Sequence, residues 1–96
     1  MAVIVLAPDA LSDLERLRTF LVNSDPAAAD QTIGLILAGI TVVEEHPLIG
    51  RPAEAGLREL VISRGRSGYL ALYRYDEARD RVLILAIRHQ REAGYV

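Results

Sequence analysis

Residues 82–87 read Val-Leu-Ile-Leu-Ala-Ile, an apolar run that no polar residue interrupts. A strand with one face in water alternates between apolar and polar residues, whereas a strand covered on both faces is apolar throughout. The run therefore predicts a central strand over residues 81–89. A small domain built around such a strand needs a covering layer on each face of its sheet.

Two further strands are predicted just before this one. Residues 57–63 and 69–75 are rich in aliphatic, β-branched and aromatic side chains, and five-residue turns at 64–68 and 76–80 separate the three segments. Connections this short favour an antiparallel meander. Residues 47–56 contain two prolines and two glycines and are predicted to form a loop.

The chain begins with a strand and a helix. A β-branched run at residues 2–6 predicts a short buried strand, which Pro8 ends. Proline suits the first turn of a helix, and Asp9 is favourable near the positive end of the helix dipole. Apolar residues then recur at spacings of three and four, which predicts a helix over residues 9–22.

A second helix is predicted directly after the first. Asp25 can cap its start, Pro26 is tolerated at its first position, and the apolar spacing continues to residue 43. Gly34 and Gly39 within it indicate either close packing against a neighbouring element or simple tolerance. The predicted order is βααβββ. This is an α+β fold, with an N-terminal strand and a helical hairpin packed on an antiparallel sheet of three to four strands.

Length and charge limit the possible classes of protein. Ninety-six residues suit a single domain spanning 1–96, and the absence of cysteine excludes disulfides and thiolate metal sites. We expect no metal, cofactor or membrane segment, and a cytoplasmic location. Residues 1–50 carry seven acids and two arginines, whereas residues 51–96 carry six acids and nine arginines. The two halves therefore have net charges of opposite sign.

One face of the predicted sheet lacks a cover. If both turns are symmetrical, residue 63 faces residue 69, and residue 75 faces residue 81. One face is then aliphatic and meets the helices: Leu60, Ile62, Leu70, Leu72, Val82, Ile84 and Ala86. The other face is mixed: Glu59, Val61, Tyr69, Ala71, Tyr73, Leu83, Leu85, Ile87 and His89. We expect a partner protein to bury part of this second face.

The same register places two arginines opposite each other. Arg58 and Arg74 would then repel, because like charges on directly opposite residues destabilise a sheet. Either the register is different, or an anion lies between them.

Three segments carry a resemblance to a known family: residues 57–62 (LRELVI), 68–75 (GYLALYRY) and 82–92 (VLILAIRHQRE). With the order of elements, they resemble the RelE/ParE superfamily of toxins over nearly the whole chain. The most specific part is the last strand running into residues 88–91. The resemblance implies the toxin of a type II toxin–antitoxin pair, wrapped by the carboxy-terminal segment of a cognate antitoxin.

The superfamily has two branches with different targets. RelE-like toxins cleave messenger RNA on the ribosome without metal, whereas ParE-like toxins are associated with inhibition of DNA gyrase. The nuclease branch commonly has an arginine near the start of the middle strand, where this chain has Tyr69. That departure favours a ParE-like toxin acting on gyrase, with the ribosome and mRNA as the alternative. Operator DNA is expected to bind only through the antitoxin.

The resemblance also suggests site residues. RNA cleavage through the 2′-hydroxyl needs proton-transfer groups and cations. For a nuclease, the candidates are Glu59, Arg66, Arg88, His89 and Tyr95. For contact with the target they are Arg88, His89, Arg91 and Tyr95. For contact with the antitoxin they are Val61, Tyr69, Ala71, Tyr73, Leu83 and Leu85. Histidine suits proton transfer near neutral pH, but a structural role for His89 at the end of its strand is the alternative.

Overall fold

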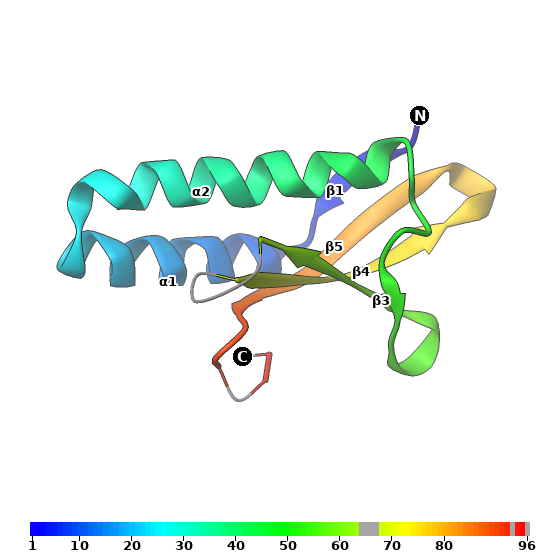
Figure 1. Ribbon diagram of the computed structural model, residues 1–96. Coiled ribbons are helices and arrows are strands. Elements are labelled where there is room, and N and C mark those ends of the chain that lie inside the picture. Colours follow the sequence, from blue (N-terminus) through cyan, green and yellow to red (C-terminus); the bar gives the residue numbers. More distant parts are fainter. Residues whose placement is uncertain (64–67, 93, 96) are drawn as a thin grey trace.

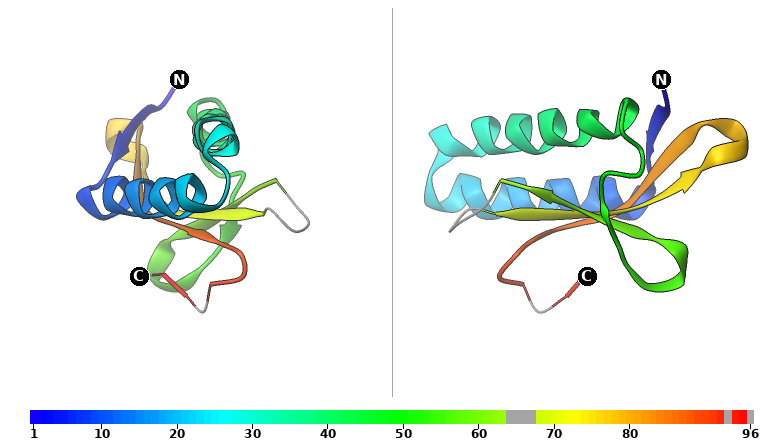
Figure 2. Two further views of the ribbon diagram at one scale, coloured as in Figure 1. Left: turned by 90° about the vertical axis from the view of Figure 1, so that its left-hand side faces the viewer. Right: turned by 45° about the vertical axis from the view of Figure 1, so that its right-hand side comes forward.

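The computed structural model describes residues 1–63, 68–92 and 94–95. Its elements are β1 (Val3–Leu6), α1 (Pro8–Ser24), α2 (Pro26–Ile40), β2 (Arg51–Pro52), β3 (Arg58–Ile62), β4 (Tyr69–Asp76) and β5 (Arg81–His89), with 3-10 turns at Thr41–Glu44, Glu54–Gly56 and Glu77–Arg79. The two helices form a hairpin on one side of a five-stranded sheet, and the C-terminal residues lie on the other side (Figures 1 and 2). The predicted α+β class and helical hairpin are confirmed.

The second helix begins as predicted. Asp25 caps α2 by accepting a hydrogen bond from the Ala28 backbone N–H, and Pro26 occupies the first turn. The segment Pro26–Glu44 is long and apolar enough to cross a membrane by length and composition alone. Here it packs on the sheet through Ile36 and Ile40, which are buried. Its core-facing stripe therefore accounts for part of its apolar composition.

The two glycines of α2 have different surroundings. A Cβ at Gly39 would lie 2.7 Å from Cγ2 of Ile62 on β3, whereas nothing lies within 4 Å of the corresponding position at Gly34. Gly39 therefore permits close packing of α2 on the sheet. At Gly34 no packing contact requires a glycine, and the helix simply tolerates it.

β5 is an interior strand of the sheet, as its apolar run predicts. The strand order is β1-β5-β4-β3-β2, so β5 lies between β1 and β4. Val82, Ile84 and Ile87 are fully buried. Two features were not predicted: β1 joins β5 in parallel, and the supposed loop at residues 47–56 contains β2, which pairs with β3.

The register between β3 and β4 differs from the predicted one. Ile62 faces Tyr69, where Ser63 was expected. Because side chains alternate between faces, a shift of one residue moves every side chain of β4 to the other face. The assumption of a symmetrical turn was therefore wrong.

The β4–β5 connection is also shorter than predicted. Asp76 pairs with Arg81, and the left-handed conformation of Asp80, with φ of 48°, helps to close a tight turn. Further along, Tyr73 pairs with Ile84 but Leu72 pairs with Ala86, so a bulge lies at residue 85. The bulge places Ile84 and Ile87 on the same side of β5, whereas the prediction assigned Ile87 to the opposite face.

Half of the predicted antitoxin surface consequently lies inside the protein. Tyr69, Ala71 and Tyr73 belong to the core on the helix side, with exposed fractions of 4%, 0% and 0%. Their prediction as a partner-facing set is wrong because of the register. Val61, Leu83 and Leu85 are half-buried and outside the core, as expected of the opposite face.

The predicted clash between two arginines does not occur. Arg58 pairs with Tyr73, and Arg74 pairs with Leu83. Arg58 instead donates to the Gly50 carbonyl at 2.8 Å. The register therefore removes the repulsion without an anion.

Tyr73 ties the sheet to the segment that follows α2. Its ring is buried, and its hydroxyl donates to the Pro47 carbonyl and accepts from the Gly50 N–H, both at 2.8 Å. A side chain at Gly50 would meet the Tyr73 ring at 2.7 Å. This contact holds the connection to β2 against the sheet.

Candidate functional site

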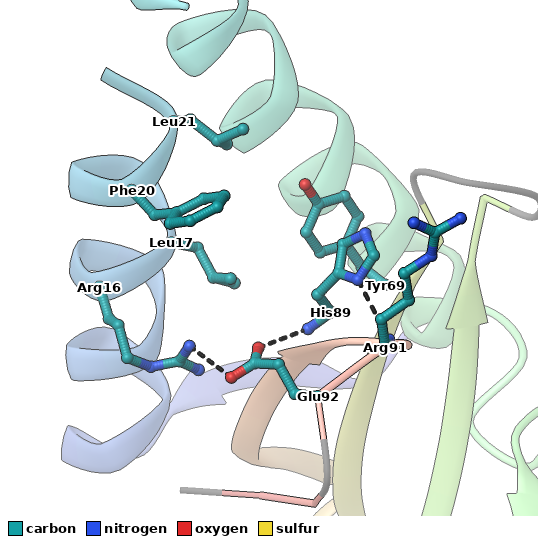
Figure 3. Close-up of a pocket in the computed structure, with 8 residues that line it drawn as sticks. All are labelled: Arg16, Leu17, Phe20, Leu21, Tyr69, His89, Arg91 and Glu92. Atoms are coloured by element: carbon teal, nitrogen blue, oxygen red, sulfur yellow. Dashed lines mark hydrogen bonds and ion pairs between the residues drawn. The ribbon is translucent and has the colours of Figure 1, made fainter. Parts of the chain in front are cut away.

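A groove of about 540 Å³ lies between α1 and the ends of β4 and β5 (Figure 3). It is lined by Arg16, Leu17, Phe20, Leu21, Tyr69, His89, Arg91 and Glu92. Phe20 is 70% exposed although it is a large aromatic side chain. The groove thus combines an apolar wall from the helix with charged groups from the segment after β5, a composition typical of binding sites.

A buried carboxylate links α1 to β5 near the groove. β1 ends at Leu6, opposite Ile84, so no strand among the described residues pairs with the last part of β5 on that edge. Asp13 of α1 fills the gap: its Oδ2 accepts the Ile87 N–H at 2.8 Å, and its side chain is almost fully buried. Helix α1 therefore replaces the missing strand partner with a charge-assisted hydrogen bond.

Arg16 extends this network to the C-terminal segment. Its Nη1 donates to Glu92 Oε2 at 2.6 Å, and its Nη2 lies 3.5 Å from Asp13 Oδ1. The other oxygen of Glu92 accepts the His89 N–H at 2.8 Å. Burial alone would raise the pKa of Glu92, but the His89 N–H and Arg16 outweigh it and lower the pKa. The chain after β5 is therefore fastened to α1 by an ionised carboxylate.

His89 has a defined orientation in the groove. Its ring meets the Tyr69 ring edge-on, with 5.1 Å between centroids and 87° between planes. Its Nδ1 accepts the Arg91 N–H at 3.1 Å. These contacts agree with the structural alternative, in which the histidine shapes the end of the strand.

A second cluster lies on the opposite face of the sheet. Tyr95 donates its hydroxyl to Glu59 Oε2 at 2.6 Å, and the Arg88 guanidinium lies over the Tyr95 ring, 5.1 Å from its centroid. Arg51 also contacts Glu59, through Nε and Oε1 at 2.9 Å. Tyr95, near the end of the sequence, thus covers part of the sheet face that the helices leave open.

The electrostatics of this cluster keep Glu59 ionised. Burial raises its pKa, but hydrogen bonds from Tyr95 and Arg51 and the charges of Arg51 and Arg88 lower it further than burial raises it. Tyr95 shifts in the other direction. Burial and then its hydrogen bond to the Glu59 carboxylate raise the pKa of the Tyr95 hydroxyl. Both oxygens of the Glu59 carboxylate thus accept hydrogen bonds, Oε1 from Arg51 and Oε2 from Tyr95.

The predicted site residues are divided between these two places. Arg88, Glu59 and Tyr95 come together on the open face, whereas His89 and Arg91 line the groove on the helix side. Arg66 lies outside the described residues. The predicted target set and the predicted nuclease set therefore do not each form one site.

Sequence reasoning missed the buried acid and its two partners. Asp13 lies three residues after Ala10 and four before Leu17, within the buried stripe of α1. The apolar spacing that predicts this helix does not include Asp13. An acid at a core position is a recognisable signal, because a buried carboxylate needs a donor from another element.

Comparisons with known proteins agree on the family. A family model described as the ParE toxin of the type II toxin–antitoxin system parDE matches residues 4–94. Toxin RelE3 of Caulobacter vibrioides is 40% identical over 92 residues, which cover 96% of this chain and 98% of the relative.

Solved structures share the fold. The chromosomal ParDE system from P. aeruginosa matches with a TM-score of 0.80 at 22% identity, covering 93% of this chain and 96% of the other. The intact RelBE toxin–antitoxin complex of E. coli matches with a TM-score of 0.64 at 15% identity, covering 96% and 100%. The RelBE2 complex of Mycobacterium tuberculosis has a TM-score of 0.61 at 24% identity, covering 93% and 98%. With the family match over residues 4–94, these findings show that the chain belongs to the ParE toxin family of type II toxin–antitoxin systems, within the RelE/ParE superfamily.

Proposed function

We propose that this toxin acts in the cytoplasm by binding its target rather than by catalysis, that the target is DNA gyrase, and that a cognate antitoxin neutralises it. The observation that carries the proposal is the hydrogen bonding of the Glu59 carboxylate and its lowered pKa. Both of its carboxylate oxygens accept hydrogen bonds from side chains, and its pKa is lowered. A general base works best with a pKa near the operating pH. Glu59 is a poor base by this criterion.

The other candidate proton-transfer groups do not complete a catalytic set. The raised pKa of Tyr95 opposes its ionisation, and its proton is directed at Glu59. His89 pairs with Tyr69 on the helix side of β5, whereas Glu59 and Tyr95 meet on the open face. Acid and base would have to act on one phosphate from opposite sides of a strand. This separation supports a toxin that works by binding.

For the antitoxin we propose the groove beside α1. Phe20 offers an exposed aromatic surface, and the Arg91 guanidinium has no ion pair or hydrogen bond with any described residue. An antitoxin segment with an apolar side chain against Phe20 and a carboxylate near Arg91 would complement both. The solved relatives include complexes of toxins with antitoxins, which supports a partner of this kind. Operator DNA would be bound by the complex through the antitoxin.

A ribosome-dependent, metal-independent mRNA endoribonuclease is the alternative. The 40% identical relative is named RelE3, and Arg88 lies beside Tyr95 on the open face, where a cation and a hydroxyl could meet a phosphate. In that case the contact between Tyr95 and Glu59 would have to break before catalysis.

The two functions are separated by a pair of assays on the same purified toxin. We expect inhibition of gyrase-catalysed supercoiling and no cleavage of messenger RNA in the ribosomal A site. Intact supercoiling activity at high toxin excess, together with A-site cleavage, would reverse the assignment.

The antitoxin site is tested by variants at the groove. Replacing Phe20 with alanine removes a large exposed aromatic group, and we expect antitoxin affinity to fall about 30-fold, as for other central aromatic anchors. Leu11→Ala is the matched control, because Leu11 is a 50% exposed apolar residue of the same helix outside the groove. Calorimetric titration measures both. Equal affinities for the two variants would place the antitoxin elsewhere.

A further inference from the structure

A strip of the open sheet face lies beyond the part covered by Tyr95. It is built from two rows of side chains that run across β1, β5 and β4. In one row Val5 pairs with Leu83, which pairs with Arg74. In the other row Val3 pairs with Arg81, which pairs with Asp76. Residues paired across neighbouring strands point to the same face, so each row forms a continuous surface.

Burial confirms which way these rows point. Val3 is 62% exposed and Val5 is 37% exposed, whereas Val82 and Ile84, which alternate with the strip residues on β5, are fully buried against the helices. The β1 side of the strip, with Leu83 next to it, is thus an aliphatic patch in contact with solvent. Such patches on small proteins commonly mark interaction sites.

The charge at the edge of the strip is positive. The exposed guanidinium of Arg74 makes no hydrogen bond or ion pair with any described residue. Asp76, the nearby acid, is held by Arg79 through an ion pair of 2.9 Å, and Arg81 also lowers its pKa. The two rows therefore combine the aliphatic residues Val3, Val5 and Leu83 with two arginines and one acid.

This surface suits a protein better than a nucleic acid. Nucleic-acid sites on sheets stack bases on aromatic side chains. All six side chains of the two rows are aliphatic or charged, and Tyr69 and Tyr73 are turned into the core. A protein surface with acidic side chains beside an aliphatic area would complement both the patch and Arg74.

We propose that the strip of Val3, Val5, Leu83, Arg74 and Arg81 is the surface through which the toxin contacts the protein that it inhibits, and that this protein presents acidic side chains beside an aliphatic surface. The inference rests on the proposed function, in which the toxin acts by binding. It assigns target and antitoxin to opposite sides of the sheet, because the groove beside α1 lies on the helix side.

The experiment measures growth arrest in cells and antitoxin affinity in vitro for the same variants. Arg74→Glu reverses the charge at the edge of the strip. We expect it to raise the toxin level needed for growth arrest about tenfold or more, while antitoxin affinity stays within about twofold. Arg74→Lys keeps the charge and should retain most of the toxicity. Arg18→Glu, an exposed arginine on α1, is the control and should leave growth arrest unchanged.

A second variant addresses the aliphatic patch. Val3→Ser removes exposed apolar surface at the end of β1, and we expect weaker growth arrest with an unchanged melting temperature. Unchanged arrest for both Arg74→Glu and Val3→Ser would overturn the proposal. So would tight, salt-sensitive binding of the wild-type toxin to a single-stranded RNA or double-stranded DNA probe that Arg74→Glu abolishes, because the strip would then be a nucleic-acid site.

If the proposed target is wrong but the strip is a target surface, the two kinds of assay give different answers. If the wild-type toxin arrests growth but leaves gyrase supercoiling intact, gyrase is not the target. The Arg74 variants still decide whether the strip contacts the actual target, because growth arrest is measured without reference to gyrase.

Discussion

Replacing Asp13 with alanine tests the link between α1 and the end of β5. The substitution removes the acceptor of the Ile87 N–H, and Ile87 is fully buried, so water cannot easily replace the carboxylate. An unsatisfied buried donor costs about 1–3 kcal/mol, and hydrogen bonds to charged groups lie in the upper part of that range. Arg16 loses one of its two carboxylate partners as well. We therefore expect a loss of about 2–3 kcal/mol.

For a domain of this size, each kcal/mol shifts the melting temperature by about 4–8 °C, so Asp13→Ala should lower it by roughly 10–20 °C. Thermal and urea denaturation followed by circular dichroism measure the loss, and hydrogen exchange of the Ile87 amide localises it. Asp13→Asn keeps an acceptor oxygen and should recover part of the stability.

Asp9→Ala is the matched control for this prediction. Asp9 is an exposed acid in the first turn of the same helix, where its interaction with the helix dipole contributes about 0.5 kcal/mol. If Asp13→Ala destabilises the protein no more than Asp9→Ala, or if exchange of the Ile87 amide is unchanged, the carboxylate does not hold β5 to the helix.

Two further predictions concern α2 and the C-terminal cluster. Gly34→Ala should stabilise the protein by up to about 1 kcal/mol, because its position is open, whereas Gly39→Ala should destabilise it through the contact with Ile62. Thermal denaturation of the two variants compares these effects directly. Equal changes in melting temperature would argue against close packing at Gly39. Tyr95→Phe should cost about 1 kcal/mol at neutral pH and raise the pKa of Glu59, measured by NMR titration of its carboxyl carbon. Because the folded-state pKa of Glu59 is lowered from 4.5, its contribution is present above that value and lost as pH falls through the folded pKa, so the stability difference should shrink in acid. A difference that is the same at all pH values would contradict this coupling.

The two helices and strand β5 could be predicted because their sequence signals are local. The apolar run of residues 82–87 indicates that β5 lies inside the sheet, and Asp25 with Pro26 shows where α2 begins. Each of these inferences depends on neighbouring residues and on the period of the regular element.

The faces of β4 could not be predicted in the same way. They depend on the register, which is set by the turns before and after the strand. The identity of Tyr69 and Tyr73 does not indicate which face they occupy, because tyrosine has an apolar ring and a polar end and suits either face. What settles Tyr73 is the pair of hydrogen bonds at its hydroxyl, from Gly50 and to Pro47, and these residues are more than twenty positions away. A one-residue error in the turn therefore moved half of the expected antitoxin surface into the core.

The charge asymmetry of the sequence has a structural consequence that depends on this corrected register. The acidic first half of the chain forms β1 and the helical layer, and the arginine-rich second half forms the rest of the sheet. With β4 in its observed register, Arg74 points to the open face beside Leu83, away from the helices. In the predicted register it would have faced Arg58 instead. The same shift that buries Tyr69 and Tyr73 therefore places on the open face a guanidinium that has no ion pair with any described residue. An acidic partner would be attracted to this side of the sheet, opposite the acidic helices.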